Sequence, residues 1–334
     1  MITRVIDAPP HRAAGSLFGL AYGDALGKET EFLPVAEIVR RYGPAGPRDL
    51  VGDPALVTDD TQMALAVAWA LREAPALAPE AVEPRLRRRF LDWASSPDND
   101  RAPGVTCLRA CAGLARGLRW QEATVAGSKG CGANMRVTPV GLLDVDLDTL
   151  AGLAQLQAGL THGHPTGLAA SELTAYAVRL LRDGAALGEL PGLLADRARE
   201  QRRVYRADWL GDLWQRPGGM TPGEFMAQGW DECLDALGRL ADALARPDDG
   251  GDPCRLTGEG WVAEEALVTA LYCAVRHADD PVGALARGAT TAGDSDSIAA
   301  LAGAFVGAAA GLAAWPADWA TRIEYADQLT ALTT

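Results

Sequence analysis

The sequence predicts an all-α protein that folds as one compact domain. Apolar residues recur with the spacing of amphipathic helices along nearly the whole chain, and alternating β-branched runs typical of strands are nearly absent. Strong helix formers fill many of the periodic segments. The chain has 334 residues, of which 48% are hydrophobic, so it can bury a sizeable core. Length alone suggests about two domains, but related motifs near both ends favour a single domain over residues 1–334.

Helices are expected wherever the apolar periodicity persists between helix-start and helix-stop residues. The predicted helices are 11–26, 35–42, 60–73, 79–94, 105–118, 148–160, 166–183, 189–203, 223–245, 261–276, 281–290 and 297–314. Four segments break the pattern and are predicted to be loops with unusual chemistry: 95–104, 126–141, 161–166 and 246–261.

Two rows of glycines spaced four residues apart stand near the ends of the chain. They are Gly15, Gly19, Gly23 and Gly27, and then Gly303, Gly307 and Gly311. A glycine inside a helix costs about 1 kcal/mol relative to alanine, so such rows need a packing reason. They form shallow grooves that let another helix approach closely. We expect one or both grooves to lie in the core, and they could face each other. A Gly/Ala-rich composition is the alternative explanation.

The charge of the chain excludes some classes of partner. The net charge is −13, so we expect no broad basic surface for nucleic acid or for an anionic membrane. The run from Ile298 to Trp315 has no charged residue, but Ala and Gly dominate it and two carboxylates precede it. A buried core helix fits this run better than a membrane span.

Compartment signals favour the cytoplasm. The six cysteines include no C-x-x-C pair, which favours reduced and mostly buried thiols in a cytoplasmic protein. The first ten residues, Met1 to Pro10, lack the apolar core of a signal peptide.

Two acidic clusters each precede an apolar, helix-like run. They are Thr58-Asp59-Asp60-Thr61 and Asp294-Ser295-Asp296-Ser297. Asp, Ser and Thr are common helix N-caps, so capping is one interpretation of each cluster. If folding brings the clusters together, their oxygen atoms suit magnesium, manganese or calcium better than zinc. The repetition of the same form at both ends favours the metal site.

Three further segments are weaker signals. Gly23-Asp24-Ala25-Leu26-Gly27, with Glu31 after it, places carboxylates near a glycine turn, although Asp24 could be a buried structural acid and Glu31 a surface residue. The loop 128–136 contains a G-x-G pattern of the kind that presents backbone N–H groups to phosphate, and no strand precedes it, which excludes a Rossmann fingerprint. In Thr161-His162-Gly163-His164-Pro165, a histidine could bind a sugar or phosphate, or the segment could be only a helix-entry turn.

Taken together, these segments resemble the ADP-ribosylglycohydrolase family, which includes the dinitrogenase-reductase-activating glycohydrolases. The shared motifs, in the order of the family, are G-D-A-L-G at 23–27 with the later Glu31, T-D-D-T at 58–61, S-K-G-C-G-x-x-M-R at 128–136, T-H-x-H-P at 161–165, G-x-G-W-V-A-E-E-A-L at 258–267 and G-D-S-D-S-I-A at 293–299. The resemblance implies an all-α fold, two divalent cations (Mg²⁺ or Mn²⁺) at the base of a cleft, and hydrolysis of the bond between ADP-ribose C1″ and an acceptor.

The resemblance also implies roles for individual residues. The metal ligands would be Thr58, Asp59, Asp60, Asp294, Asp296, Ser297 and a conformationally mobile Glu31. The substrate-binding residues would be Ser128, Gly130, Gly132, Met135, His162 and Trp261, with the glycines at the diphosphate, His162 at the distal ribose and Trp261 on the adenine side. The catalytic residues would be Asp60, Asp296 and, in a D-x-x-P-G-x-T loop, Asp100.

An arginine side chain is the favoured acceptor. The loop 98–106 resembles that of arginine-type members, and its carboxylates could pair with a guanidinium through bidentate hydrogen bonds, unless Arg101 of the same loop occupies them. The alternatives are a serine-linked or small-molecule conjugate, and a relative that binds ADP-ribose without turnover. A metal phosphohydrolase is disfavoured because the His-Asp pair of many such enzymes is missing. The expected partner is an ADP-ribosylated protein or small molecule, with the oligomeric state left open.

Overall fold

The computed structural model of the protein describes residues 10–333. The expectation about a signal peptide concerns residues 1–9 and lies outside this range. All named secondary-structure elements from residue 10 to residue 333 are helices. β-Pairing in this range is limited to isolated bridges, such as the one between Gly130 and Val262. The prediction of an all-α fold is therefore confirmed.

Each predicted helix is present, with ends that lie within a few residues of those expected. They are α1 (Pro10–Lys28), α2 (Val35–Tyr42), α3 (Asp59–Glu73), α4 (Pro79–Ala94), α5 (Val105–Ala115), α8 (Leu147–Gly159), α9 (Pro165–Arg182), α10 (Leu190–Gln201), α12 (Pro222–Ala245), α14 (Ala263–Arg276), α15 (Pro281–Ala289) and α16 (Ser295–Ala310).

The sequence pattern did not predict the shorter helices. These are α6 (Trp120–Ala123), α7 (Thr138–Gly141), α11 (Ala207–Leu210), α13 (Cys254–Thr257), α17 (Trp319–Arg322), α18 (Ala326–Thr333) and the 3₁₀ turns η1 (Cys131–Ala133), η2 (Leu187–Glu189), η3 (Leu213–Gln215) and η4 (Leu312–Ala314). Most are a single turn, which is too short for an apolar periodicity to be recognised. Accordingly, α7 and α13 lie inside segments that were predicted to be loops.

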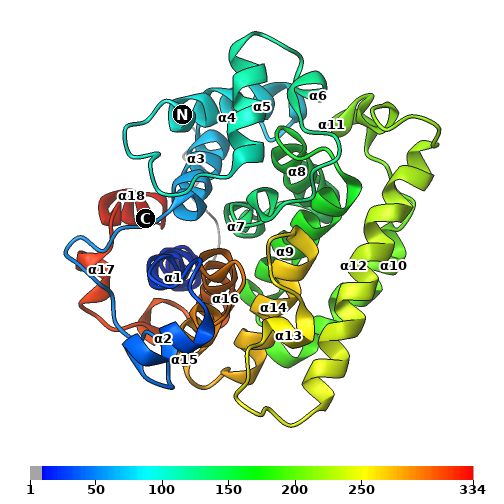
Figure 1. Ribbon diagram of the computed structural model, residues 1–334. Helices are drawn as coiled ribbons and strands as arrows, with labels where there is room; N and C mark the ends of the chain where they lie inside the picture. Colours follow the sequence, from blue (N-terminus) through cyan, green and yellow to red (C-terminus); the bar gives the residue numbers. More distant parts are fainter. Residues whose placement is uncertain (1–9, 334) are drawn as a thin grey trace.

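Helices α1 and α16 run antiparallel with their backbones in contact along the two glycine rows (Figure 1). A Cβ atom on Gly19 would lie 2.3 Å from the carbonyl oxygen of Gly303, and one on Gly307 would lie 1.9 Å from that of Gly15. The expectation that the grooves pack in the core, against each other, is thus confirmed. Gly311 lies just beyond the helix, where it caps α16 with a φ of +82°. We call this contact the glycine seam.

The other helices surround this central pair. Helix α15 packs against both α1 and α16, while α9 and α14 pack against α16. Helices α3 and α4 form a neighbouring pair, and α10 and α12 pack on each other at the outer side of α9 (Figure 1). Most buried apolar side chains from α1 to α18 belong to one continuous cluster. The two ends of the described chain thus contribute to the same core.

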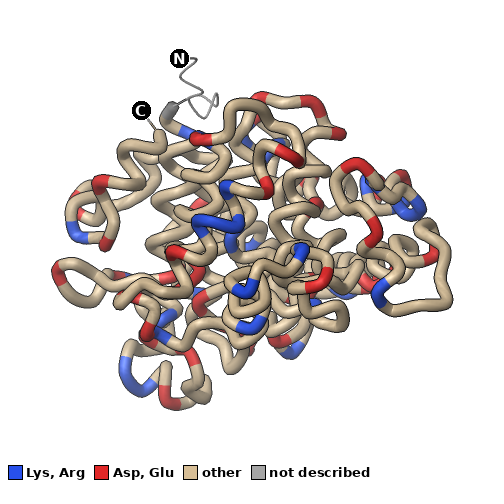
Figure 2. The backbone as a smooth tube through the Cα atoms, turned by 90° about the horizontal axis from the view of Figure 1, so that it is seen from above, with Lys and Arg blue, Asp and Glu red and all other residues tan. Residues whose placement is uncertain are grey.

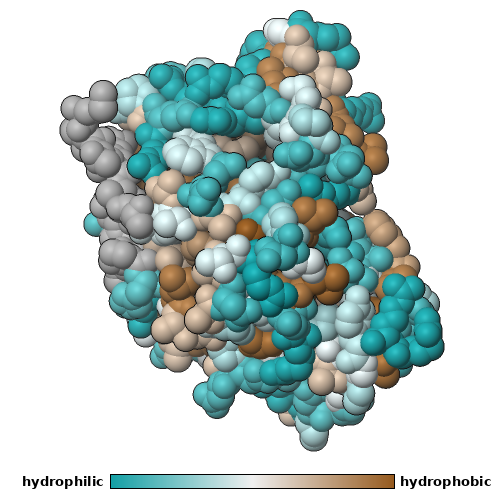
Figure 3. Space-filling model, turned by 90° about the vertical axis from the view of Figure 1, so that its left-hand side faces the viewer, coloured by the Kyte–Doolittle hydropathy of each residue, from teal (hydrophilic) through white to brown (hydrophobic). Residues whose placement is uncertain are grey.

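The surface is mixed in charge and polarity. Basic and acidic positions are interspersed along the backbone (Figure 2), and on the face shown in Figure 3 apolar residues form small, separate patches among hydrophilic ones. None of the helices within residues 10–333 combines the length and apolarity needed to cross a membrane. All six cysteines are buried, as expected, and none forms a disulfide within the described part of the chain.

Candidate active site

The start of α3 is held by a carboxylate from α1. Asp24 is fully buried and accepts hydrogen bonds from the backbone N–H groups of Thr58 and Thr61, at 3.0 Å each, and from both hydroxyls. These bonds satisfy donors that lack partners inside the helix. Asp24 is therefore the buried structural acid that the sequence offered as one interpretation. Thr58 is itself the N-cap of α3, so Asp59 and Asp60 are not needed for capping.

The start of α16 lies beside that of α3. Asp294 is the N-cap of α16, with its Oδ1 atom 3.4 Å from the N–H of Ser297, so the capping interpretation is correct for this residue. Asp296 accepts a 3.0 Å bond from the same N–H. Its Oδ2 atom lies 3.2 Å from the Thr58 hydroxyl, which links the two clusters directly. Residues separated by more than half of the chain therefore converge at one point.

Burial and mutual repulsion disfavour the charged forms of these acids. Burial raises the pKa of Asp59 to about 7 and that of Glu31 to about 9, and the nearby Asp296 adds to both shifts. Burial and neighbouring carboxylates also raise the pKa of Asp60 and of Asp294 well above the usual range. A bound cation would reverse this effect by favouring the charged forms.

The donor set fits a hard divalent cation. The Oδ1 atom of Asp60 is buried without a hydrogen-bond partner in the described residues, which is unusual for a carboxylate oxygen. The hydroxyls of Thr58 and Ser297 add neutral oxygen donors of the kind that Mg²⁺ and Mn²⁺ accept. In residues 10–333, however, no three His, Cys, Asp or Glu side chains are arranged as a ready-made ion cage. The chemistry of the donors, and not a preformed cage, is what favours cation binding here.

These acids open into a cleft of about 200 Å³. Of the predicted metal ligands, Glu31, Asp59, Asp294, Asp296 and Ser297 line it. Of the predicted substrate-binding residues, Gly130, Gly132, Met135, His162 and Trp261 line it as well. Ser128 is set behind this lining, where its hydroxyl lies 3.0 Å from that of Thr106, a residue that does line the cleft. The structure thus brings both predicted groups to one cavity.

The two glycines of the G-x-G loop make room for a histidine. A Cβ atom on Gly130 would lie 3.3 Å from Nε2 of His162, and one on Gly132 would lie 3.0 Å from its Cε1. The loop is also tied to the segment before α14, because the Cys131 N–H donates to the carbonyl of Trp261 at 3.0 Å. Close packing against His162 is thus one observed reason for these glycines.

The two histidines of the T-H-x-H-P motif have different environments. His164 is the N-cap of α9, with Nδ1 3.3 Å from the N–H of Thr166, and Pro165 is the first residue of the helix. His162 is only 2% exposed and lies on the cleft. The helix-entry interpretation is therefore correct for His164, while His162 belongs to the lining of the cleft.

An aromatic pair stands at the rim of the cleft. The rings of Phe32 and Trp261 are stacked, with centroids 5.8 Å apart and planes 13° from parallel. Both are exposed, Phe32 at 67% and Trp261 at 40%. Phe32 follows Glu31 directly and has a φ of +63°, which is uncommon for a residue other than glycine. This contact links the segment that carries Glu31 to the segment before α14.

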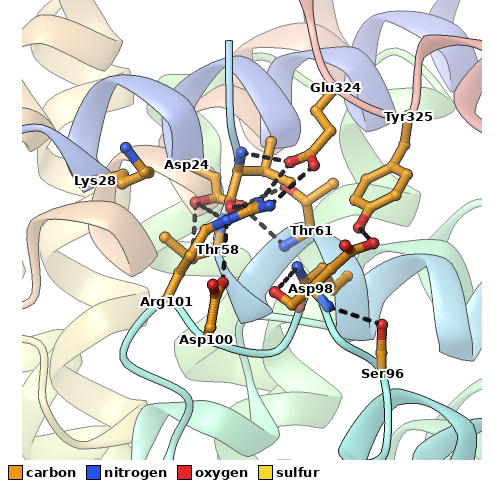
Figure 4. A network of polar contacts seen from close by, with 12 residues as sticks. Asp24, Lys28, Thr58, Thr61, Ser96, Asp98, Asp100, Arg101, Glu324 and Tyr325 are labelled. Atoms are coloured by element: carbon orange, nitrogen blue, oxygen red, sulfur yellow. Dashed lines mark hydrogen bonds and ion pairs between the residues drawn. The ribbon is translucent and has the colours of Figure 1, made fainter. Parts of the chain in front are cut away.

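The loop of residues 95–104 is tied to the C-terminal part of the chain (Figure 4). Arg101 donates to both carboxylate oxygens of Glu324, at 2.6 and 3.0 Å, and to the carbonyl of Val57 at 2.5 Å. Asp98 accepts a 2.9 Å bond from the Tyr325 hydroxyl. Three segments that are distant in sequence therefore meet just before the acidic start of α3.

The end of this loop reaches the acids. The N–H of Gly104 donates to Oδ2 of Asp59 at 3.0 Å, and Ala102 and Gly104 line the cleft. Asp100 is not among the lining residues: its side chain is 74% exposed and its Oδ1 atom lies 3.7 Å from Arg101. Of the predicted catalytic residues, Asp296 lines the cleft, and Asp100 lies outside it. Asp60, like the predicted metal ligand Thr58, is buried and is not among the lining residues.

Comparison with known proteins decides the family. The sequence model of the ADP-ribosylglycohydrolase family matches residues 7–334. The chain belongs to this family. It is 28% identical to ADP-ribosylhydrolase ARH3 of Bos taurus, over 92% of this chain and 87% of that one. It is 26% identical to ADP-ribosylarginine hydrolase Tri1 of Pseudomonas putida strain GB-1, over 96% and 76% of the two chains.

A solved structure of an ADP-ribosylglycohydrolase-related protein complex is also similar. It superposes with a TM-score of 0.67 and 25% identity, over 97% of this chain and 96% of that one. The resemblance inferred from the motifs is thus confirmed for both family and fold.

Some residues around the cleft of this family member were not predicted from the sequence. Phe32 had only its position after Glu31 as a signal. Glu324 and Tyr325 had none, because they lie in an irregular segment far along the chain from the residues that they contact. A polar residue next to a short helix gives no periodic pattern from which its partner could be inferred.

Proposed function

We propose that this protein hydrolyses the glycosidic bond between ADP-ribose and an acceptor, with the help of two divalent cations, and that the acceptor is an arginine side chain. The observation that carries the proposal is the convergence of the two acidic helix starts on one cleft, through the contact between Thr58 and Asp296. Family membership supports the reaction class. A capping role alone would not require the starts of α3 and α16 to meet.

The chain's own residues would perform separate tasks around the bound substrate. When bound, two divalent cations would supply Lewis acidity toward the ribose hydroxyls and the attacking water. Thr58, Asp59, Asp60, Asp294, Asp296 and Ser297 would hold them, together with Glu31. The Oδ1 atom of Asp60, which has no partner within residues 10–333, would accept the proton of the attacking water, and Asp296 is the alternative base.

The opposite part of the cleft would bind the rest of ADP-ribose. His162 and the loop 128–136 would contact the ribose and diphosphate, and Trp261 would offer an aromatic face to the adenine. The stacking of Trp261 on Phe32 supports this role, because it holds the indole in a fixed orientation at the rim.

We place the loop of residues 95–104 on the acceptor side of the cleft, and its geometry favours arginine as the acceptor. Glu324 holds Arg101 by a bidentate ion pair, whereas Asp100 lies 3.7 Å from it and is exposed. The Asp100 carboxylate lies outside the cleft and makes only this longer ion pair, so it would be free to pair with a guanidinium on a substrate that extends beyond the cleft. Similarity to an ADP-ribosylarginine hydrolase from Pseudomonas putida agrees with this choice.

The test compares peptides modified at arginine and at serine. Each would be incubated with the protein in Mg²⁺ and, separately, in excess chelator, and released ADP-ribose would be measured. We expect faster release from the arginine-linked peptide, and none in chelator. Faster release from the serine-linked peptide would overturn the acceptor assignment alone. Binding of ADP-ribose without release from any conjugate would overturn the hydrolase and support a binding protein.

A further inference from the structure

A buried arginine without a counter-ion lies behind the cleft. Arg136 is fully buried, and none of the ion pairs within residues 10–333 includes it. Its guanidinium lies 4.4 Å from the centre of the Phe90 ring, and Nη2 donates to the carbonyl of Gln157 at 2.6 Å and to the hydroxyl oxygen of Thr161 at 2.8 Å. A guanidinium has donors only, so Thr161 must be the acceptor in this contact.

The hydroxyl proton of Thr161 then has two acceptors within reach. They are Nδ1 of His162, at 2.8 Å, and the carbonyl of Ala158, at 3.4 Å. The Ala158 carbonyl already accepts the backbone N–H groups of Thr161, at 3.1 Å, and of His162, at 2.9 Å. Because a carbonyl oxygen has two lone pairs, both are occupied. The hydroxyl proton is therefore directed to His162, over the shorter distance.

This assignment fixes the hydrogen on the other ring nitrogen. If Nδ1 accepts from Thr161, a neutral imidazole carries its hydrogen on Nε2. Nε2 lies on the side of Gly130 and Gly132, at the cleft, and none of the described hydrogen bonds engages it. Burial, reinforced by the charge of Arg136, lowers the pKa of His162 well below its usual value, so the ring stays neutral.

We propose that Arg136 and Thr161 act as positioning residues that set the tautomer of His162, so that its Nε2–H donates into the cleft to an oxygen of the ADP-ribose moiety. The tautomer follows from the contacts alone, whereas the ligand rests on the proposed function. A donor whose hydrogen is already aimed at the cleft requires no reorganisation when the ligand arrives. This arrangement also gives the unpaired charge of Arg136 a role. Because Arg136 can only donate, the Thr161 hydroxyl accepts from Arg136 and donates to His162.

The tautomer can be observed directly in protein labelled with ¹⁵N at histidine. We expect long-range ¹H–¹⁵N spectra to show a pyridine-type Nδ1 and a pyrrole-type Nε2 for His162. The Thr161→Val variant removes the hydroxyl at nearly constant volume, and the Thr161→Ser variant retains it. His164, whose Nδ1 accepts from Thr166, is an internal reference that neither variant should affect. Denaturant unfolding of each variant identifies any loss of fold.

Affinity for ADP-ribose in Mg²⁺, measured by calorimetry, tests the consequence. Thr161→Val should weaken binding by about 3- to 10-fold, the value of one hydrogen bond, while Thr161→Ser should bind as wild type does. A pyrrole-type Nδ1 in the wild type would overturn the proposal. So would equal affinities of folded Val and Ser variants. If ADP-ribose bound to no form while the His162 spectrum was as expected, the proposed function would fail and the tautomer assignment would stand.

Discussion

On one side of the cleft the backbones of α1 and α16 touch along the glycine seam. Asp296 lies at one end of this seam, beside Gly27. On the other side, residues 95–104 form a loop that is positioned mainly by side chains, above all by the bidentate pair of Arg101 and Glu324. The acids thus stand on rigid, buried backbone, whereas the loop 95–104 depends on an ion pair whose side chains are 17% and 14% exposed.

The seam and the loop should therefore respond differently to substitutions. Helix backbones in contact cannot adapt to added volume, because no side chain is free to rotate away. A loop held by an ion pair can shift while the fold persists. We therefore expect changes at the seam to act on folding, changes at the acids to act on turnover, and changes at the loop to act on the choice of acceptor.

The largest effect is expected at the seam. A Cβ atom on Gly23 would lie 2.0 Å from the carbonyl oxygen of Ala299, so Gly23→Ala should lower the free energy of unfolding by about 3 kcal/mol or more. Gly238, on the exposed face of α12, has nothing within 4 Å of the same added atom. Gly238→Ala should therefore stabilise the protein by about 0.5–1 kcal/mol, because alanine favours the helix.

The measurement is denaturant unfolding followed by circular dichroism. If Gly23→Ala lowers the free energy of unfolding while Gly238→Ala raises it, the seam has no room for a methyl group. Equal stability of the Gly23→Ala variant and the wild type would contradict the seam as the rigid side of the cleft.

The next largest effect is expected at the acids. The glycine seam positions these acids, but the acids do not stabilise the seam. Asp60→Ala should reduce turnover of an ADP-ribosylated peptide by about 10²- to 10⁴-fold, because it removes the carboxylate proposed as base. The variant should remain folded, and more stable in the absence of cations, because a source of like-charge repulsion is removed. The control is Asp235→Ala, on the exposed face of α12, which should retain activity. Full turnover by the folded Asp60→Ala variant in Mg²⁺ would refute its catalytic role.

The seam and the acids could be predicted from the sequence because their signals are local and periodic. Glycines repeated every four residues indicate a close helix contact, and an acidic cluster before an apolar run marks a helix start. The residues alone did not separate the roles of His162 and His164, and only the family resemblance assigned the ribose to His162, since the separation depends on which residue faces the glycines at 130 and 132. Whether Asp24 was structural also stayed open, because only the fold shows that it receives the N–H groups of Thr58 and Thr61.

The loop 95–104 was predicted only in part. Its composition indicated a loop with carboxylates, and the possibility that Arg101 pairs with them was recognised. The actual partner, Glu324, lies more than 200 residues away along the chain, in an irregular segment before α18. A single ion pair across such a distance has no counterpart in local periodicity, so its existence follows only from the assembled fold.

A smaller effect is expected when this ion pair is broken. Arg101→Met should lower kcat/KM for an arginine-linked peptide by about 10-fold, because the loop that bears Asp100 loses its anchor, while the affinity for free ADP-ribose should be unchanged. The matched control is Arg119→Met, which breaks the exposed pair with Asp212, whose side chains are 58% and 43% exposed. It should change neither quantity. A parallel loss of ADP-ribose affinity in Arg101→Met would show that the two sides of the cleft are not independent.

The smallest effect concerns stability as a function of pH. The folded-state pKa values of Asp59, about 7, and Glu31, about 9, lie above their ordinary values of 3.8 and 4.5. The folded protein therefore holds protons that the unfolded chain releases, and stability falls as pH rises through this interval. Metal-free protein should melt at a lower temperature at pH 9 than at pH 6, by a few degrees.

Mg²⁺ should raise the melting temperature more at pH 9, where the carboxylates are free of protons and best able to bind it. Asp60→Ala should reduce both the pH dependence and the Mg²⁺ response, whereas Arg101→Met should leave both unchanged, because the charges concerned lie on the rigid side of the cleft. A Mg²⁺ response that is equal at the two pH values, or that persists in full in Asp60→Ala, would place cation binding away from the converging acids.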